Sequence, residues 1–482
     1  MFCGSAGVQL RNDEREKHLR RIEETSLALF VVLLLIAFNS TGIAANFEKS
    51  VNDDYAIVVS QTTLNDVDWK LVIDALVAKH NGQIIRYDKE VEQAFPALKE
   101  QYPRYTCFVA KPDESNADFV RSVHQLTRRL DEDPYTDTLW AILTGHNARN
   151  ALAIARHDQP LVIRKVASGT EVALEMCQQG LWYDELVKHK KVKKEAGGKP
   201  QQIEGPADTT KALAATLTDY KADLFVTSGH ADERSWIIGF RYRNGKFVSK
   251  AGQMFGEDLQ GKRFEITSPN PKVYLPIGNC SMGHIDGSDA MTLAWMNSCG
   301  VKQMIGYIVP TWFGYAGWGC LDYFVEQPGR YTFVEAFHAN HHALIHKLLS
   351  ATGTRDERGL MHDRDVVALY GDPKWEARMA DASRAYEQQL VENNGVYSFT
   401  IDPQRAADSF KPINTNGSQR GWRPIVHFLP RRIKNITIIA GYDLRPTITE
   451  NFILVPNPRE CDPQHEYKVV FRAQTFDEET DQ

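Results

Sequence analysis

The sequence predicts an α/β protein with a mostly parallel sheet flanked by helices, followed by a small all-β sandwich domain. From about residue 55 to residue 350, short runs rich in β-branched and aromatic residues alternate with segments of helical period. Beyond residue 394 only short strand-like runs remain, and Pro, Asn and Gly separate them. The 482 residues are roughly three times the length of a typical domain of ~150 residues, so several domains are expected.

Residues 66–79 illustrate the helical period, because Trp69, Val72, Ile73 and Leu76 fall on one face of a helix. The strands expected in the α/β part cover residues 55–59, 84–87, 105–109, 139–143, 223–227, 273–277 and 303–307. The further helices expected between them cover about 115–130, 147–156, 167–179, 208–219, 289–298 and 332–350. This order is typical of parallel strands joined by helical crossovers.

Two charged stretches interrupt this alternation. Residues 188–199 combine a dense positive charge with two glycines, which predicts a solvated loop, and residues 376–391 are expected to form a charged helix. The strands of the β module are expected at residues 397–401, 424–429, 436–440, 451–455 and 467–471.

The amino-terminal segment is predicted to direct export. The basic residues Arg15, Lys17, Arg20 and Arg21 precede an uninterrupted apolar run of 12 residues, 27–38, and small residues suited to cleavage near Ala44 or Ala45 follow it. A membrane-spanning helix needs ~20 apolar residues, so a signal peptide is favoured over an uncleaved anchor. The expected locations are therefore periplasmic, cell-surface or extracellular, with the membrane reached only through this segment. Cys3 would be lost with the leader.

Four regions follow from these patterns. Residues 1–45 form the signal peptide or anchor, 46–220 the first part of the α/β region, 221–393 its second part, and 394–482 the β module. With 56 basic and 62 acidic side chains the net charge is −6, which argues against a nucleic-acid partner. The seven cysteines form no C-x-x-C pair, so the question becomes whether one of them is reactive.

Two expected strands end in residue types suited to nucleophilic catalysis. The first leads into Ser228, Gly229 and His230, and the second into Asn279 and Cys280. In an open parallel sheet, functional side chains gather beyond the carboxyl ends of the strands. If the two strands are neighbours, His230 can activate the Cys280 thiol for attack on a carbonyl. The alternative is a buried strand-end cysteine and an unrelated loop histidine.

With these motifs the sequence resembles the gingipain family of cysteine peptidases, in the caspase-like fold group that includes clostripain and the caspases. The aromatic loop Thr311-Trp-Phe-Gly-Tyr-Ala-Gly-Trp318 and the late Leu369-Tyr-Gly-Asp-Pro373 are similar to that family, over residues of about 50 to 385. The β module resembles the immunoglobulin-like domain that follows the catalytic domain in gingipains. One departure is Ala231, where many relatives have Gly.

The resemblance implies an exported cysteine endopeptidase, a hydrolase that acts on protein or peptide substrates through Cys280 and His230. It also implies that the backbone N–H groups of Gly229 and Cys280 form the oxyanion hole. Trp312 and Tyr315, with Trp318, would line the substrate pocket, while the acidic residue that binds a basic P1 side chain in gingipains is not placed. No metal or cofactor is needed for the chemistry; relatives often hold structural calcium, for which the candidates here are Asp232, Glu233, Asp286 and Asp289.

Three other interpretations stay open at this point. A catalytically inactive caspase-like scaffold or binding protein at the cell envelope would keep the fold, and a β module on a separate linker would favour it. His338, His342 and His346 share one helix face and could hold a transition metal, although no H-E-x-x-H base is present. Finally, Ser281 could be the nucleophile of a serine hydrolase, because the sequence around it is close to the G-x-S-x-G motif, although the first glycine of that motif is missing.

Overall fold

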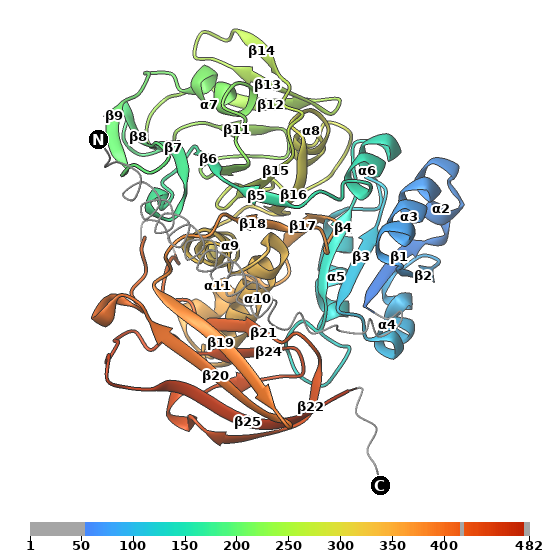
Figure 1. The fold of residues 1–482 in the computed structure, drawn as a ribbon. Coiled ribbons are helices and arrows are strands. Elements are labelled where there is room, and N and C mark those ends of the chain that lie inside the picture. Colours follow the sequence, from blue (N-terminus) through green and yellow to red (C-terminus); the bar gives the residue numbers. More distant parts are fainter. Residues whose placement is uncertain (1–53, 415–418, 477–482) are drawn as a thin grey trace, which may run out of the picture. The chain divides into compact units, whose positions relative to one another are not determined.

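A computed structural model describes residues 54–414 and 419–476, which belong to one compact unit of the chain (Figure 1). The predicted leader, its cleavage site and Cys3 lie outside these residues. Among the residues described, no helix has both the length and the apolar character needed to cross a bilayer.

A sheet of 12 strands runs through the α/β part, and most of its neighbouring strands are parallel. The antiparallel pairs are β16 with β17, β7 with β8, and β8 with β9. In spatial order the strands are β2 (Gln83–Tyr87), β1 (Tyr55–Ser60), β3 (Tyr105–Val109), β4 (Leu139–Leu143), β17 (Val367–Gly371), β16 (Val301–Tyr307), β15 (Lys272–Pro276), β10 (Leu224–Thr227), β6 (Lys165–Ser168), β7 (Gln179–Tyr183), β8 (Lys190–Lys194) and β9 (Gln201–Glu204).

Helices flank this sheet, and six of those described lie where the sequence predicts helices. Strands β1, β4 and β15 are buried along their whole length, which explains their continuous apolar runs. The helices are α2 (Gln61–Asn65), α3 (Val67–His80), α4 (Phe95–Gln101), α5 (Ala117–Thr127), α6 (Ala148–Ala155), α7 (Thr210–Thr218), α8 (Met291–Ser298), α9 (Tyr315–Glu326), α10 (Phe333–Leu349) and α11 (Arg355–Asp363). The predicted fold class, a mostly parallel α/β sheet flanked by helices, is confirmed.

Polar caps fix where two of these helices begin. The Asn116 side chain accepts hydrogen bonds from the first turn of α5, and Thr332 and Glu335 form a reciprocal capping box at the start of α10. These caps position His124 on α5 and His341 on α10, which become neighbours in the folded chain.

The carboxyl-terminal module consists of two antiparallel sheets around one core, as expected for a sandwich. Phe399, Ile425, Ile453 and Phe471 of the two sheets belong to that core. The first sheet has the order β19 (Tyr386–Asn393), β20 (Val396–Pro403), β25 (Tyr467–Thr475) and β22 (Ile433–Ala440). The second has the order β21 (Ile425–Phe428), β24 (Phe452–Val455) and β23 (Thr447–Ile448).

Two smaller sheets complete the fold. One is a meander of four antiparallel strands inserted between β10 and β15, and the other joins two distant segments in parallel. The meander consists of β11 (Ser235–Ile237), β12 (Lys246–Lys250), β13 (Gln253–Glu257) and β14 (Arg263–Ile266). The pair consists of β5 (Leu161–Ile163) and β18 (Ala377–Met379).

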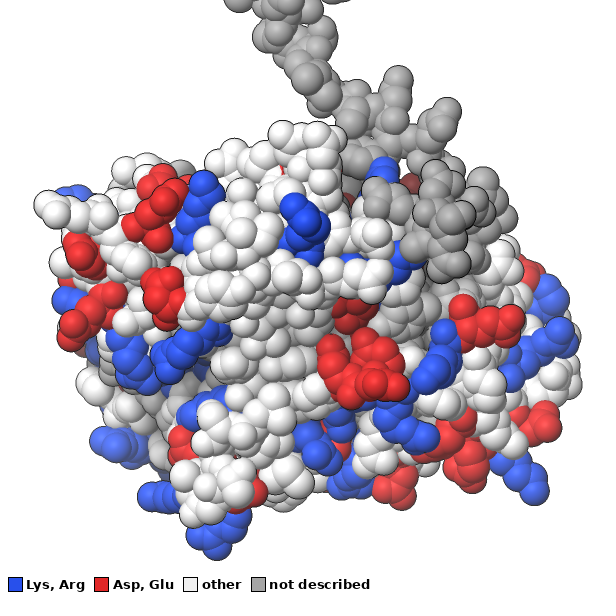
Figure 2. Space-filling view, turned by 90° about the horizontal axis from the view of Figure 1, so that it is seen from below, with Lys and Arg blue, Asp and Glu red and all other residues white. Residues whose placement is uncertain are grey.

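The β module packs directly on the α/β part. The Tyr323 hydroxyl on α9 donates to Pro424 O at 2.6 Å, and buried Arg420 and Arg423 pair with buried Asp322 at 3.2 and 3.0 Å. Phe452 and Leu454 of β24 belong to the main hydrophobic core. The module is therefore not a separate unit on a linker. On the face shown in Figure 2, acidic and basic side chains are intermixed.

Three local expectations are wrong. Residues 376–391 form strands β18 and β19, because β19 pairs with β20 through a tight turn at Asn394 and Gly395, both with positive φ. Residues 188–199 include strand β8, whose lysine side chains lie over Trp182 and Tyr183. Residues 167–179 hold only a short 3₁₀ turn at Leu174–Met176.

Candidate active site

The site lies where three adjacent parallel strands of the sheet end. In the register of β10 with β15, Thr227 is opposite Pro276, and β16 is the next neighbour of β15. The segment after β10 carries His230, the one after β15 carries Cys280, and the one after β16 carries Thr311. The expectation that the two predicted strands are neighbours is confirmed.

Asn279 ties the first two segments together. Its side-chain oxygen accepts from Thr227 Oγ1 at 2.7 Å, and its Nδ2 donates to Gly229 O at 3.1 Å. Asn279 is fully buried, so these bonds fix the spacing of the two segments away from competing water. Trp236 Nε1 donates to Ser228 O at 2.8 Å and holds the His230 segment from the other side.

Cys280 differs from every other cysteine in the described part of the chain, because it alone is not buried. Burial raises the pKa of Cys177 to about 12 and that of Cys299 to about 11, so both remain thiols. The backbone N–H of Thr311 donates to Cys280 Sγ at 3.2 Å. The thiol in turn lies 3.8 Å from Thr311 O, so both backbone polar groups of Thr311 contact the sulfur.

The backbone around Cys280 and His230 is unusual. Ser281, directly after the cysteine, has φ +54, and Gly229, directly before the histidine, has φ +96. A non-glycine residue at positive φ is uncommon, and such positions cluster at functional sites. The N–H of Ser281 donates to Val309 O, whereas the N–H groups of Gly229 and Cys280 make no hydrogen bond within residues 54–414 and 419–476. Both groups predicted for the oxyanion hole thus have a free donor.

His230 is exposed and stacks on Phe240, with 4.7 Å between the ring centroids. In the described part of the chain its ring makes no hydrogen bond, to Cys280 or to any other group. Catalytic hydrogen bonds are often long or absent without substrate and form only in the complex.

Glu185 is a carboxylate at this site that the sequence analysis missed. Its Oε1 accepts from Thr170 Oγ1 at 2.7 Å, while its Oε2 is buried without a hydrogen-bond partner. A Cβ placed on Gly229 would lie 3.3 Å from Oε2, so the carboxylate sits directly beside the residue that precedes His230. Burial raises the pKa of Glu185 to about 7. Glu185 lies just beyond β7, at the same edge of the sheet, but this strand was not among those predicted from the sequence.

The predicted pocket aromatics divide into two groups. Trp312 follows Thr311 and is 55% exposed, with its ring 5.5 Å from that of His362. Tyr315 and Trp318 are buried at the start of α9 under Arg423 and Arg420, with 3.9 and 4.9 Å from guanidinium to ring centroid. Trp312 therefore offers surface to a ligand, and the role of Tyr315 stays a prediction.

The carboxylates considered for calcium have protein partners. Asp286 pairs with Arg234 at 2.8 Å, Glu233 lies 3.3 Å from His284, and Asp289 accepts from the N–H of Ala251. Elsewhere in the described part of the chain, two groups of side chains bring possible metal-ligand atoms within 4.8 Å of one another. One group is His124, His341 and Asp365, and the other is Asp131, Asp133 and Asp137.

The histidines that share a face of α10 do not gather around one point. His338 Nε2 accepts from the backbone N–H of Trp140 at 3.0 Å, His342 stacks on Phe452, and His346 lies beside the hydroxyl of Tyr135. None of the three belongs to a metal-ligand cluster among the residues described.

Comparisons with known proteins give similar structures only. No protein-family model matches the chain, and no curated protein matches it significantly. The Arg-specific cysteine proteinase gingipain R has a TM-score of 0.45 and 11% identity over 85% of this chain and 93% of that chain. The complex of the pro- and mature domains of RgpB from Porphyromonas gingivalis has a TM-score of 0.42 and 10% identity, over 84% of this chain and 93% of that chain. A structure described as a protease has a TM-score of 0.42 and 10% identity, over 88% of this chain and 98% of that chain. These values do not show membership of a family.

Proposed function

We propose that this protein is an exported cysteine endopeptidase with Cys280 as nucleophile and His230 as general base and acid. The observation that carries the proposal is the placement of both residues at the carboxyl ends of two hydrogen-bonded parallel strands, with Asn279 joining the two segments. The docked β module also supports an enzyme over an adhesion protein with a separate module.

The reaction follows from the groups present. His230 accepts the thiol proton, and the Cys280 sulfur attacks the peptide carbonyl to form a tetrahedral intermediate. The free N–H groups of Gly229 and Cys280 stabilise its oxyanion, each by about 3 kcal/mol. The intermediate collapses to a thioester, and His230 gives its proton to the leaving amine. His230 then activates a water molecule, which hydrolyses the thioester and restores the thiol.

Substrate selection involves Trp312 and Glu185 in this proposal. Trp312 supplies an exposed apolar wall next to Thr311, the residue whose backbone contacts Cys280. Glu185 supplies a buried carboxylate oxygen without a partner, beside Gly229. A buried unpaired carboxylate is costly, and a basic P1 side chain that reaches it would relieve that cost. We therefore expect cleavage after Lys or Arg.

The test is hydrolysis of fluorogenic peptides with Arg, Lys, Leu or Asp at P1 by the full chain. Cys280→Ser and His230→Gln are expected to abolish cleavage. The matched controls are Cys461→Ser in the β module and His284→Gln beside Glu233, and both should retain activity. A folded protein that cleaves none of these peptides and no denatured protein substrate would favour the inactive scaffold.

A further inference from the structure

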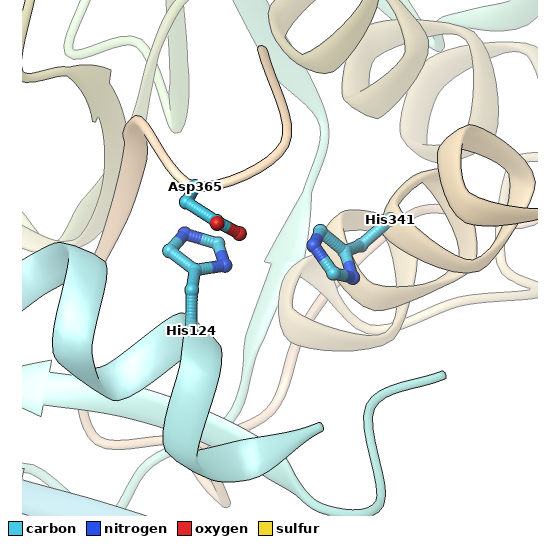
Figure 3. A group of neighbouring side chains, drawn as sticks. All are labelled: His124, His341 and Asp365. Carbon is cyan, nitrogen blue, oxygen red and sulfur yellow. The ribbon is translucent and has the colours of Figure 1, made fainter. Parts of the chain in front are cut away.

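A second cluster of chemically competent side chains lies away from the strand ends, between α5, α10 and the segment before β17. His124, His341 and Asp365 each offer a ligand atom, and these atoms lie within 4.8 Å of one another. All three residues are buried, at 2, 6 and 7% exposure. Figure 3 shows the Asp365 carboxylate and the two imidazole rings facing one another across a common space.

The hydrogen bonds of the two histidines determine which ring nitrogens carry lone pairs. His124 Nε2 lies 2.9 Å from Val367 O and must donate to it, so Nδ1 carries the lone pair. That Nδ1 is buried and has no hydrogen-bond partner. His341 Nε2 lies 3.1 Å from Arg364 O and donates to it in the metal-free chain, so His341 Nδ1 accepts from Thr136 Oγ1 at 3.0 Å. A metal ion would bind the other tautomer, in which Nδ1 donates to Thr136 Oγ1 and Nε2 carries the lone pair. Metal-binding histidines typically donate their second ring N–H to such an oxygen.

Burial disfavours a positive charge on both imidazoles. Burial lowers the pKa of His124 to about 4, and burial with neighbouring cationic groups holds the pKa of His341 well below its ordinary value. They are therefore neutral at pH 7, and neutral imidazole is a strong ligand for zinc.

We propose that His124 Nδ1, His341 Nε2 and Asp365 form a binding site for a transition-metal ion of the Zn²⁺ class. Two imidazole nitrogens and one carboxylate oxygen suit Zn²⁺ or Co²⁺ and leave a fourth position for water or for the carbonyl oxygen of Arg364, which lies 3.1 Å from His341 Nε2. The inference does not depend on the peptidase activity.

Arg128 limits the affinity of this site. Its Nη1 lies 2.6 Å from Asp365 Oδ1 without forming a well-directed hydrogen bond, and Arg364 pairs with the other carboxylate oxygen at 2.8 Å. An incoming cation must displace Arg128 from Asp365 against charge repulsion. Removal of the Arg128 charge should therefore tighten metal binding, a result that a purely structural Arg128–Asp365 pair does not predict.

The bound ion would stabilise a segment that reaches the peptidase site. Asp365 lies two residues beyond Asp363, whose carboxylate accepts from Ala316 N at 3.1 Å, and three beyond His362, whose ring is near Trp312. The expected effect is a higher melting temperature of the full chain with Zn²⁺.

The test is titration of the metal-free full chain with Co²⁺, followed by its visible absorption, and competition with Zn²⁺. We expect one Co²⁺ per chain with tetrahedral absorption, lost in Asp365→Asn and in His124→Gln and retained in the control His346→Gln. Thr136→Val should weaken binding about tenfold, and Arg128→Gln should strengthen it. Absence of the absorption in the wild-type chain, or binding that is unchanged in Asp365→Asn and His124→Gln, would overturn the proposal.

Discussion

Replacement of Glu185 by Gln should change how stability depends on pH. The pKa of this carboxyl is raised from its ordinary value of 4.5 to about 7, mainly by burial. The native state therefore keeps a proton that the unfolded state has already released between these two values. Because the unfolded state binds fewer protons in that window, stability falls as the pH rises from about 4.5 to about 7.

The size of the effect follows from the shift. A difference of about 2.5 units at 1.36 kcal/mol per unit gives a loss of up to about 3 kcal/mol from this one group. Glu185→Gln keeps an acceptor for Thr170 Oγ1 but has no charge to desolvate. The variant should therefore gain stability relative to the wild type at high pH and show no such gain at low pH.

Urea denaturation at about pH 4 and about pH 8 measures this difference. Glu195→Gln is the control, because that carboxylate is 69% exposed and pairs with Lys193 at the surface. The reasoning is refuted if the gain of Glu185→Gln is the same at both pH values. In the peptidase assay, cleavage after Arg should rise with pH through about 7 in the wild type and lose that rise in the variant.

Two further substitutions separate binding from stability. Arg423→Met leaves Arg420 and the N–H of Gly421 as partners of buried Asp322 and should cost about 3 kcal/mol in urea denaturation. Lys411→Met, at an exposed pair, should cost less than about 1 kcal/mol, and equal costs would contradict the assigned role of the buried pair. Trp312→Ala should raise KM severalfold with a change in unfolding free energy of at most about 1 kcal/mol, because the ring is 55% exposed. The control Tyr442→Ala, on the β module, should leave KM unchanged, and an unchanged KM in Trp312→Ala would remove this residue from the substrate site.

The sequence predicted the strands and helices best where burial imposes a strong pattern. The runs at β1, β3 and β4 are continuous and apolar because these strands are covered on both faces, and the corresponding boundaries differ by a residue or less. The same pattern placed His230 and Cys280 at the ends of neighbouring strands. The parallel topology thus allowed the sequence to predict that residues 230 and 280 lie near each other, although they are far apart in the chain.

Elements at the surface were harder to predict, because pairing with distant strands, rather than their own sequence pattern, decides their structure. The charged run at residues 386–391 has helical composition, yet pairing with β20 and the turn at Asn394 make it a strand. Glu185 and the group of His124, His341 and Asp365 were missed for a related reason. Their members come from segments far apart in the chain, so no local spacing signals that they meet.

The central claim is that Cys280 is a nucleophile activated by His230. Mass-spectrometric mapping of iodoacetamide labelling at neutral pH, in the wild type and in His230→Ala, tests it most directly. The account predicts fast labelling of Cys280, slow labelling of the buried cysteines, and a collapse of the Cys280 rate in the variant. Slow labelling of Cys280 that does not respond to the loss of His230 would contradict the account.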